Sequence, residues 1–198
     1  MVDAGIGRLL IASLHEGIAD VSPTRLEFYE NWLTPPGLRD HKFGLAPLHA
    51  VLSFLRLEGQ HTYERIMTKA GQHSADWAYA DLPSVERALV RRLPAWLRAR
   101  WALRISKRVV AQTFKGSRAR VRIKKNEGTV GIQASIFCTV RERAAFPMCV
   151  FYCAAVERFL RHFDLDAHVR ITECRAHGGS DCTMAVSIQT PQAAAQAA

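Results

Sequence analysis

The segment TECRAHGGSDC, residues 172–182, has two cysteines that bracket a seven-residue loop containing a double glycine. Apolar residues alternate with polar ones on both sides of this loop, which is the period of β-strands. The segment therefore predicts a hairpin of two strands, 167–174 and 183–188, whose loop returns Cys182 close to Cys174. Thiolate–zinc bonds are only about 2.3 Å long, so a metal site needs sulfurs that converge in this way.

A second pair of strands precedes the hairpin. Basic and apolar residues alternate over 120–124, residues 125–128 have the composition of a turn, and 129–137 again has the pattern of a strand. Between the two pairs, Pro147 opens an amphipathic helix. Residues 118–189 therefore predict a strand–strand–helix–strand–strand module with a four-stranded antiparallel sheet.

The N-terminal part, residues 1–115, has the pattern of helices, because apolar residues recur at steps of three and four. The fold class expected is α+β, with a helical N-terminal half packed on the sheet. We expect a single domain over 1–190 and a disordered, low-complexity tail at 191–198. The predicted helices cover residues 6–19, residues from Ser22-Pro23 to about Leu33 with a stop at 34–37, a stretch around 48–55, residues 63–77, and two helices on either side of Pro94.

The composition indicates a soluble protein. The chain has 198 residues with 48% hydrophobic content, and it shows neither an apolar run long enough to cross a bilayer nor a secretory signal at its start. A cytoplasmic location follows as an expectation. Five cysteines make an odd count for a set of disulfides, and in a reducing compartment they are expected to be thiols, metal ligands or redox groups.

The formal net charge of +9 is distributed unevenly, with fourteen Lys or Arg and no acid between Arg87 and Lys125. The helical part of this basic stretch most simply predicts a solvated face on a helix that packs against the core. The strand part of the same stretch predicts a surface for an anionic partner. Nucleic acid is the weaker candidate, because the aromatic pattern of single-strand binders is missing. The residues predicted to meet the anion are Arg118, Arg120, Arg122 and Lys124.

The remaining cysteines admit more than one interpretation. Cys149 stands at the start of the predicted helix, where free amides and the helix dipole favour a thiolate. Cys138 follows the end of a predicted strand and is expected to serve packing. Because lone cysteines often act as small buried hydrophobic residues, spacing alone leaves a thiol cluster without metal as the alternative to a metal site.

The run FPMCVFY at 146–152, the helix that follows, the segment 172–174 and the segment CTMAV at 182–186 together resemble the 4-vinyl-reductase domain family. This family includes a bacteriochlorophyll-biosynthesis protein and the sensor domains of phenol-responsive bacterial transcription activators, and it shares a Bet3-like fold with subunits of the TRAPP vesicle-tethering complex. The resemblance covers residues 118–189.

The resemblance implies a fold that is often dimeric, with a hydrophobic ligand pocket and a zinc ion held by three cysteines and one glutamate. The glutamate position is Ile171 here, which cannot bind metal. Cys153, one helical turn after the first cysteine, is the favoured fourth ligand and His177 the alternative; alternation on the strand directs Glu173 away. Four sulfurs would suit zinc or, less well, an iron–sulfur cluster. The three cysteines carried over are Cys149, Cys174 and Cys182.

The function predicted is binding of a small hydrophobic or aromatic molecule, as a sensor or carrier that signals through a protein partner. An enzyme or enzyme accessory in tetrapyrrole or aromatic metabolism is the alternative. No catalytic triad, phosphate-binding loop or pair of catalytic carboxylates stands out, which argues mildly against an enzyme. The residues predicted to line the pocket are Trp101, Phe137, Phe151 and Tyr152.

Overall fold

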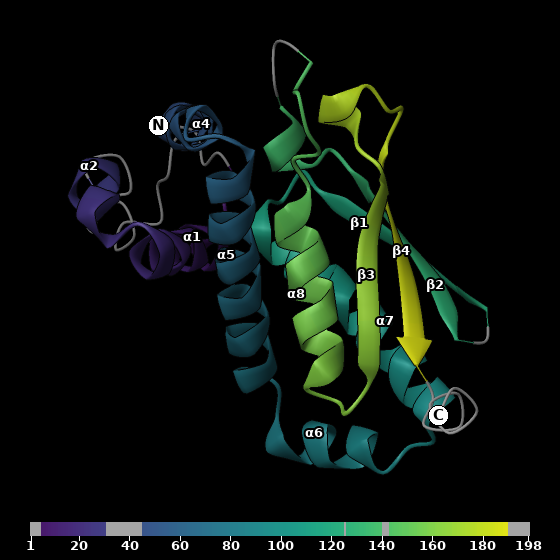
Figure 1. Ribbon diagram of the computed structural model, residues 1–198. Coiled ribbons are helices and arrows are strands. Elements are labelled where there is room, and N and C mark those ends of the chain that lie inside the picture. Colours follow the sequence, from purple (N-terminus) through teal and green to yellow (C-terminus); the bar gives the residue numbers. More distant parts are fainter. Residues whose placement is uncertain (1–4, 31–44, 125, 140–142, 190–198) are drawn as a thin grey trace, which may run out of the picture.

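The computed structural model describes residues 5–30, 45–124, 126–139 and 143–189. Over these ranges the chain forms helices first and then a four-stranded antiparallel sheet with one further helix, so the predicted α+β class is confirmed (Figure 1). Three expectations lie outside the described residues: the end of the second helix with its stop at 34–37, the turn residue Lys125, and the tail 191–198.

The helical half agrees with the periodicity of the sequence, with differences of a few residues at helix ends. Pro94 separates α6 from α7 as predicted, because its extended backbone (φ −54°, ψ 148°) precedes the first residue of α7 and its ring occupies the position before a helix begins. The bounds are α1 (Arg8–Val21), the 3-10 turn η1 (Pro23–Arg25), α2 (Leu26–Glu30), α4 (Leu45–Leu57), α5 (Gln60–Ala80), α6 (Ser84–Arg91) and α7 (Ala95–Thr113).

The sheet has the order β1-β2-β4-β3 and is antiparallel throughout. Its strands are β1 (Arg118–Lys124), β2 (Glu127–Gln133), β3 (Asp166–Glu173) and β4 (Cys182–Gln189). The expectation that the second strand reaches Phe137 is wrong. Ala134 adopts a left-handed backbone (φ 52°), which turns the chain out of the sheet, and residues 136–138 form the 3-10 turn η2 (Ile136–Cys138).

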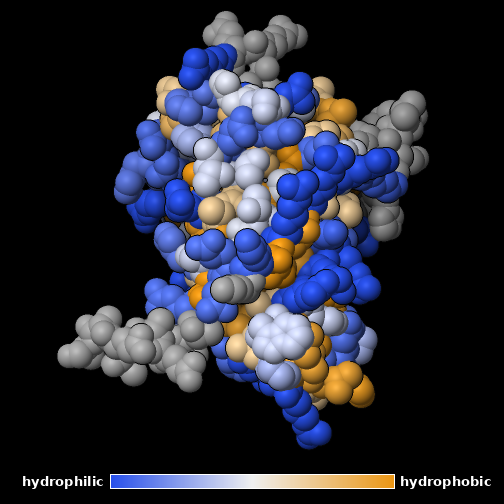
Figure 2. Space-filling view, turned by 90° about the vertical axis from the view of Figure 1, so that its right-hand side faces the viewer, coloured by the Kyte–Doolittle hydropathy of each residue, from blue (hydrophilic) through white to orange (hydrophobic). Residues whose placement is uncertain are grey.

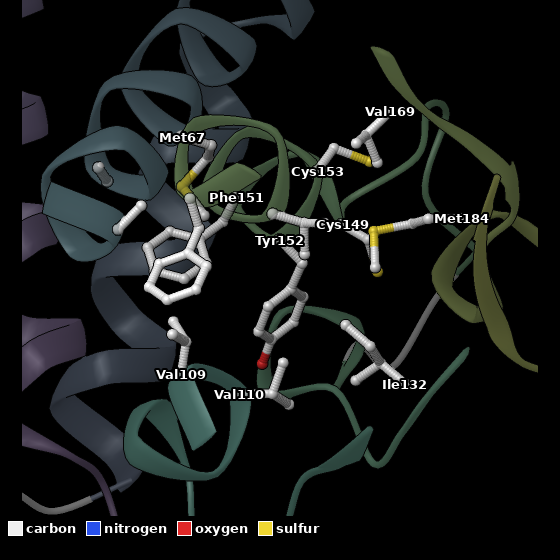
Figure 3. Close-up of a cluster of buried hydrophobic side chains, with 14 of the residues drawn as sticks. Met67, Val109, Val110, Ile132, Cys149, Phe151, Tyr152, Cys153, Val169 and Met184 are labelled. Carbon is white, nitrogen blue, oxygen red and sulfur yellow. The ribbon is translucent and has the colours of Figure 1, made fainter. Parts of the chain in front are cut away.

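Helices cover one face of the sheet. Helix α8 (Val150–Arg161) packs on β3, α7 packs on β1, α5 packs on α8, and α1 packs on α5 (Figure 1). Strand alternation gives the sheet a buried face, where Ile132 and Met184 meet the helices (Figure 3), and an opposite face of exposed polar side chains. No helix in the described ranges combines the length and the apolar character needed to cross a membrane.

Helices α5 and α8 approach each other closely, and Gly71 of α5 lies at their contact. A Cβ atom placed on Gly71 would lie 2.3 Å from the Phe151 carbonyl oxygen of α8. That oxygen belongs to the backbone and cannot move aside like the end of a flexible side chain. The absence of a side chain at Gly71 therefore fixes the distance between α5 and the helix that carries Phe151 and Tyr152.

Gly71→Ala is expected to lower the free energy of unfolding by about 1–3 kcal/mol, because overpacking against backbone exceeds the intrinsic helical gain of alanine over glycine. Urea denaturation measures the change. The control is Gly131→Ala in β2, where a Cβ atom meets nothing within 4 Å and stability should stay within about 0.5 kcal/mol. Equal stability of both variants and the wild-type protein would contradict the close packing described here.

Candidate metal centre and neighbouring aromatic cluster

Four cysteines from four separate elements meet at one end of the sheet. Cys138 ends η2, Cys149 is the N-cap of α8, Cys174 lies between β3 and the 3-10 turn η3 (Arg175–His177), and Cys182 begins β4. All four side chains are buried, and their sulfur atoms lie within 4.8 Å of one another. We call this group the four-cysteine cluster. Such a group is a candidate site for a metal ion.

The sulfur–sulfur distances in the four-cysteine cluster can be compared with those around a metal. Cys138 lies 3.2 Å from Cys149, 3.6 Å from Cys174 and 3.3 Å from Cys182, and the Cys149–Cys174 distance is 3.9 Å. A tetrahedral zinc with bonds of about 2.3 Å places its sulfurs about 3.8 Å apart. The spacing therefore fits a single ion with small adjustments. An iron–sulfur cluster shares the four thiolates among two or four irons bridged by sulfide and needs the thiolate sulfurs to span the whole cluster, so it fits less well.

Hydrogen bonds among the thiols and from one backbone amide shift the pKa values of the cluster. The Met148 amide donates a hydrogen bond to the Cys174 sulfur at 3.3 Å. Hydrogen bonds from Cys138, the other thiols and this amide hold the pKa of Cys174 well below its usual range, and the hydrogen bond with Cys138 raises the pKa of Cys149. Ionising one sulfur thus opposes ionisation of its neighbours. All four can become thiolates together only around a cation.

Arg56 of α4 holds the turn that carries Cys138. Its Nη2 donates a hydrogen bond to the Phe137 carbonyl oxygen at 3.2 Å, and its buried Nε has no acceptor among the described residues. Burial lowers the pKa of the Arg56 guanidinium, while attraction to Tyr63 and Cys138 raises it. Arg56 therefore brings a positive charge to the edge of the four-cysteine cluster. A metal bound by four thiolates would carry a net negative charge that this group could offset.

The fourth sulfur differs from the expectation, because Cys153 is not part of the cluster. Cys149 is the N-cap and has a non-helical backbone (φ −87°, ψ 18°), so the four-residue spacing does not place the two cysteines side by side. Instead, Cys153 and Val169 both line a surface depression of about 200 Å³. Figure 3 shows the side chains of these two residues next to each other. Burial raises the pKa of Cys153 to about 12.

The other candidates for the fourth position serve the loops around the cluster. His177 is exposed, and its Nδ1 donates to the Ala144 carbonyl at 3.0 Å, which ties η3 to the segment before α8. The Glu173 carboxylate accepts hydrogen bonds from the amide and the hydroxyl of Ser180 and so closes the loop between the two strands. Ile171 is partly buried against the core. None of these three residues belongs to the four-cysteine cluster.

Cys138 was the residue that sequence reasoning missed. A strand running to Phe137 placed it at a strand end, where a cysteine usually packs as an apolar residue. Two features of the sequence could have pointed to Cys138 as a fourth ligand. It lies eleven residues before Cys149, and the loop between the two cysteines returns the chain to the same end of the sheet. A break in the strand before Cys138 would have brought it into consideration.

Next to the cluster lies a buried group of three aromatic rings. Phe137, Phe151 and Tyr152 are fully buried, and their ring centroids are 5.0–5.5 Å apart. The Tyr152 hydroxyl lies 3.4 Å from the Thr113 hydroxyl, at the α7 side of the core where Figure 3 shows Val109 and Val110. The rings fill the space in which a ligand was expected, so a ligand could enter only if they moved. Burial raises the pKa of Tyr152.

The fourth predicted pocket residue, Trp101, lies in another cluster. Its ring packs edge-on against Phe163 at 5.2 Å between centroids, and Phe163 also contacts Tyr79 and Phe159. The structure thus brings together three of the four predicted pocket residues and places Trp101 apart from them, among the aromatic side chains where α5, α7 and α8 end or begin.

The predicted basic strand lies at the edge of the sheet. Arg118, Arg120, Arg122 and Lys124 of β1 are all exposed, while the residues between them are partly buried, as strand alternation requires. Arg122 and Lys124 border a shallow depression of about 340 Å³ on the open face of the sheet, and Arg170 of β3 lies on its far side. Glu127 also lines this depression and offsets part of the positive charge, so binding of an anionic partner there stays a prediction.

No family model matches the sequence, and no curated protein matches it either. Solved structures do resemble its fold. An H-NOX protein from K. algicida in its unliganded Fe(II) form has a TM-score of 0.58 at 12% identity, covering 94% of this chain and 98% of that one. The phenol-responsive sensory domain of the transcription activator PoxR, crystallised with phenol, has a TM-score of 0.50 at 15% identity, covering 78% of this chain and 80% of that one.

A trafficking protein particle complex subunit 3 from Naegleria fowleri, covalently bound to palmitic acid, is also similar, with a TM-score of 0.49 at 15% identity over 91% of this chain and 96% of that one. At these identities the likeness to the H-NOX and PoxR structures concerns the fold alone. The chain therefore has a fold of the kind found in these two proteins.

Arg56→Met is expected to lower the free energy of unfolding by about 1–3 kcal/mol, because the change leaves the buried Phe137 carbonyl oxygen without its charged donor. Urea denaturation checks this value. Arg65→Met, at an exposed position of the neighbouring helix α5, is the control and should change stability by less than about 0.5 kcal/mol. If the two variants are equally stable, Arg56 does not support the turn that carries Cys138.

Proposed function

We propose that this protein binds a small hydrophobic or aromatic molecule, as a sensor or carrier, and that a zinc ion on the four-cysteine cluster fixes the architecture beside the binding region. The observation that carries the proposal is the convergence of four buried sulfurs from Cys138, Cys149, Cys174 and Cys182. Two of these cysteines directly adjoin the aromatic cluster in the sequence: Cys138 follows Phe137, and Cys149 precedes Phe151 by two residues.

The metal proposal rests on the number, burial and spacing of the sulfurs. Four cysteines are a complete ligand set for a structural zinc, which takes four ligands and leaves no open position for a substrate. A buried group of this composition gains little as a purely hydrophobic core, because thiols 3.2 Å apart are crowded. The role proposed for the ion is therefore structural and not catalytic. A metal-free thiol cluster is the outcome that the metal analysis below would reveal.

The ligand proposal rests on the aromatic cluster and on the fold. The PoxR sensory domain, with its bound phenol, shows that a fold of this kind can hold an aromatic molecule. In this chain, the Tyr152 and Thr113 hydroxyls place polar groups inside an otherwise apolar region. Such a combination suits a molecule that has an aromatic ring and one hydrogen-bonding group. Binding would require Phe137, Phe151 or Tyr152 to change rotamer.

Several finer expectations remain proposals. A cytoplasmic location fits cysteines that form no disulfide. Membership of the 4-vinyl-reductase family fits the fold, and a homodimeric state and a signalling partner are proposed from that resemblance. An enzymatic role in tetrapyrrole or aromatic metabolism is the less favoured alternative, because a closed four-sulfur site offers no position for a reacting group.

Metal analysis of freshly purified protein is expected to give about one zinc per chain. Cys138→Ser should remove most of this zinc, because a hydroxyl is a much weaker ligand than a thiolate. Cys153→Ser is the matched control, a buried cysteine on the adjacent helix that lies outside the cluster, and it should retain the full zinc content.

Three results would contradict this assignment. Wild-type protein without metal would leave a thiol cluster, and loss of zinc in Cys153→Ser but not in Cys138→Ser would require a different arrangement of the loops. A visible absorption band that is bleached by dithionite would indicate iron and sulfide in place of zinc.

A panel of phenols, fatty acids and tetrapyrroles is expected to contain at least one molecule that raises the Tm, because a ligand that binds only the native state stabilises it. Tyr152→Phe should reduce the shift caused by a phenol, since the variant removes the hydroxyl proposed to meet the ligand. Tyr79→Phe, which removes a hydroxyl from the other aromatic cluster, is the control and should leave the shift unchanged. If no compound changes the Tm, the ligand proposal fails.

A further inference from the structure

Helix α6 is amphipathic, but its apolar face points outward. Val85 and Leu89 are one helical turn apart and are 77% and 63% exposed. The helix is held to the protein mainly by Val90, which is 2% exposed, and by Leu82 just before it, which is 8% exposed. Surface helices normally turn the apolar stripe toward the core, so this arrangement leaves an apolar face without a partner in the described part of the chain.

The charged side of α6 faces the body of the protein. The guanidinium groups of Arg87 and Arg91 lie over the ring of Tyr79, 5.2 and 5.9 Å from its centre. Arg91 also donates a hydrogen bond to the His162 carbonyl oxygen at 3.2 Å and lies 4.0 Å from the Asp164 carboxylate. These contacts fix the rotation of the helix. The outward direction of Val85 and Leu89 is therefore a consequence of specific interactions.

The beginning of α7, which contacts α6, adds further exposed side chains. Trp96, the second residue of α7, is 59% exposed, and the exposed residues that follow it at helical spacing are Arg100, Arg104 and Arg108. These three arginines have no acidic partner among the residues that the structure describes, and the sequence from Arg87 to Lys124 contains no acid. Figure 2 shows apolar side chains beside strongly hydrophilic ones at the lower end of the molecule, where Figure 1 places α6.

We propose that α6 and the start of α7 form a docking surface for an anionic lipid bilayer, with Val85, Leu89 and Trp96 entering the headgroup region and the arginines of α7 meeting lipid phosphates. Helices that lie on membranes combine an apolar face with basic residues in this way, and tryptophan is favoured at the boundary between lipid and water. This inference is independent of the metal and ligand proposals.

Other occupants fit the surface less well. A second copy of the chain, related by a two-fold axis, would bring two surfaces of the same positive charge together and would supply no acidic partner for the arginines of α7. A nucleic acid would pair with the arginines but would leave Val85 and Leu89 without an apolar contact. An anionic bilayer satisfies both the charge and the apolar side chains.

Flotation of the full-length protein with lipid vesicles tests the proposal. Vesicles of phosphatidylcholine with phosphatidylserine should bind the wild-type protein, vesicles of phosphatidylcholine alone should bind it much less, and salt should weaken binding as it screens the charges. The double variant Val85→Ser with Leu89→Ser should bind about tenfold less tightly. The double variant Arg100→Glu with Arg104→Glu should lose at least about twentyfold, since each basic residue near a membrane contributes roughly a fivefold factor.

Leu57→Ser is the matched control, because Leu57 is 82% exposed at the end of a different helix, α4, and its removal should leave vesicle binding unchanged. Circular dichroism and the Tm establish that every variant is folded. The proposal is overturned if wild-type protein does not float with anionic vesicles, or if both double variants bind as well as the wild type. It is also overturned if the wild-type protein binds no vesicles and forms a dimer that the double serine variant dissociates. This surface would then be an interface between copies.

Discussion

Four cysteine side chains pack together in one buried volume at the end of the sheet, and the loops between the C-terminal elements have to bring all four sulfurs there. The loop from β2 to α8 supplies Cys138 and Cys149, and the loop from β3 to β4 supplies Cys174 and Cys182. A backbone hydrogen bond from the Ala144 amide to the Ala176 carbonyl oxygen at 2.7 Å also ties the two loops to each other. Sulfurs at these distances cannot all carry charge unless a cation lies among them, so the same geometry that joins the loops also makes the four-cysteine cluster a candidate site for a metal ion.

This end of the sheet also determines the position of the aromatic cluster. Because Phe137 precedes Cys138 in a short 3-10 turn, a displacement of that turn would move both the sulfur and the ring. Phe151 and Tyr152 lie in the first turn of α8, directly after the N-cap Cys149, and Gly71 sets how closely α5 approaches that turn. A ligand that displaced one of these rings would therefore disturb the loops around the sulfurs. On the ligand proposal, such a displacement would reach the surface formed by η3 and residue 143, where Arg143 donates a hydrogen bond to the His177 carbonyl oxygen.

The sequence predicted those parts of the structure that depend on local periodicity. Helical spacing located α5 and α7, proline separated α6 from α7, and strand alternation located β1, β3 and β4 because one face of the sheet is buried. The loop between Cys174 and Cys182 likewise predicted that these sulfurs come close together. The fourth sulfur was not predictable in the same way, because it depends on the left-handed backbone of Ala134, a residue that rarely adopts it. The N-cap geometry of Cys149, which separates it from Cys153, is equally a matter of tertiary context.

Helix α6 illustrates the limit of periodicity as a guide to function. Its pattern identified a helix, and the rule that apolar stripes face the core would have buried Val85 and Leu89. The structure reverses this orientation because Arg87 and Arg91 find partners in Tyr79, His162 and Asp164, while the body of the protein accepts only Val90 from α6 itself. An apolar side chain that is exposed in the fold would give a gain in stabilising free energy if a second surface buried it. On the docking proposal, that gain is realised for Val85 and Leu89 when a lipid surface covers α6, and the exposed arginines of α7 favour a negatively charged one.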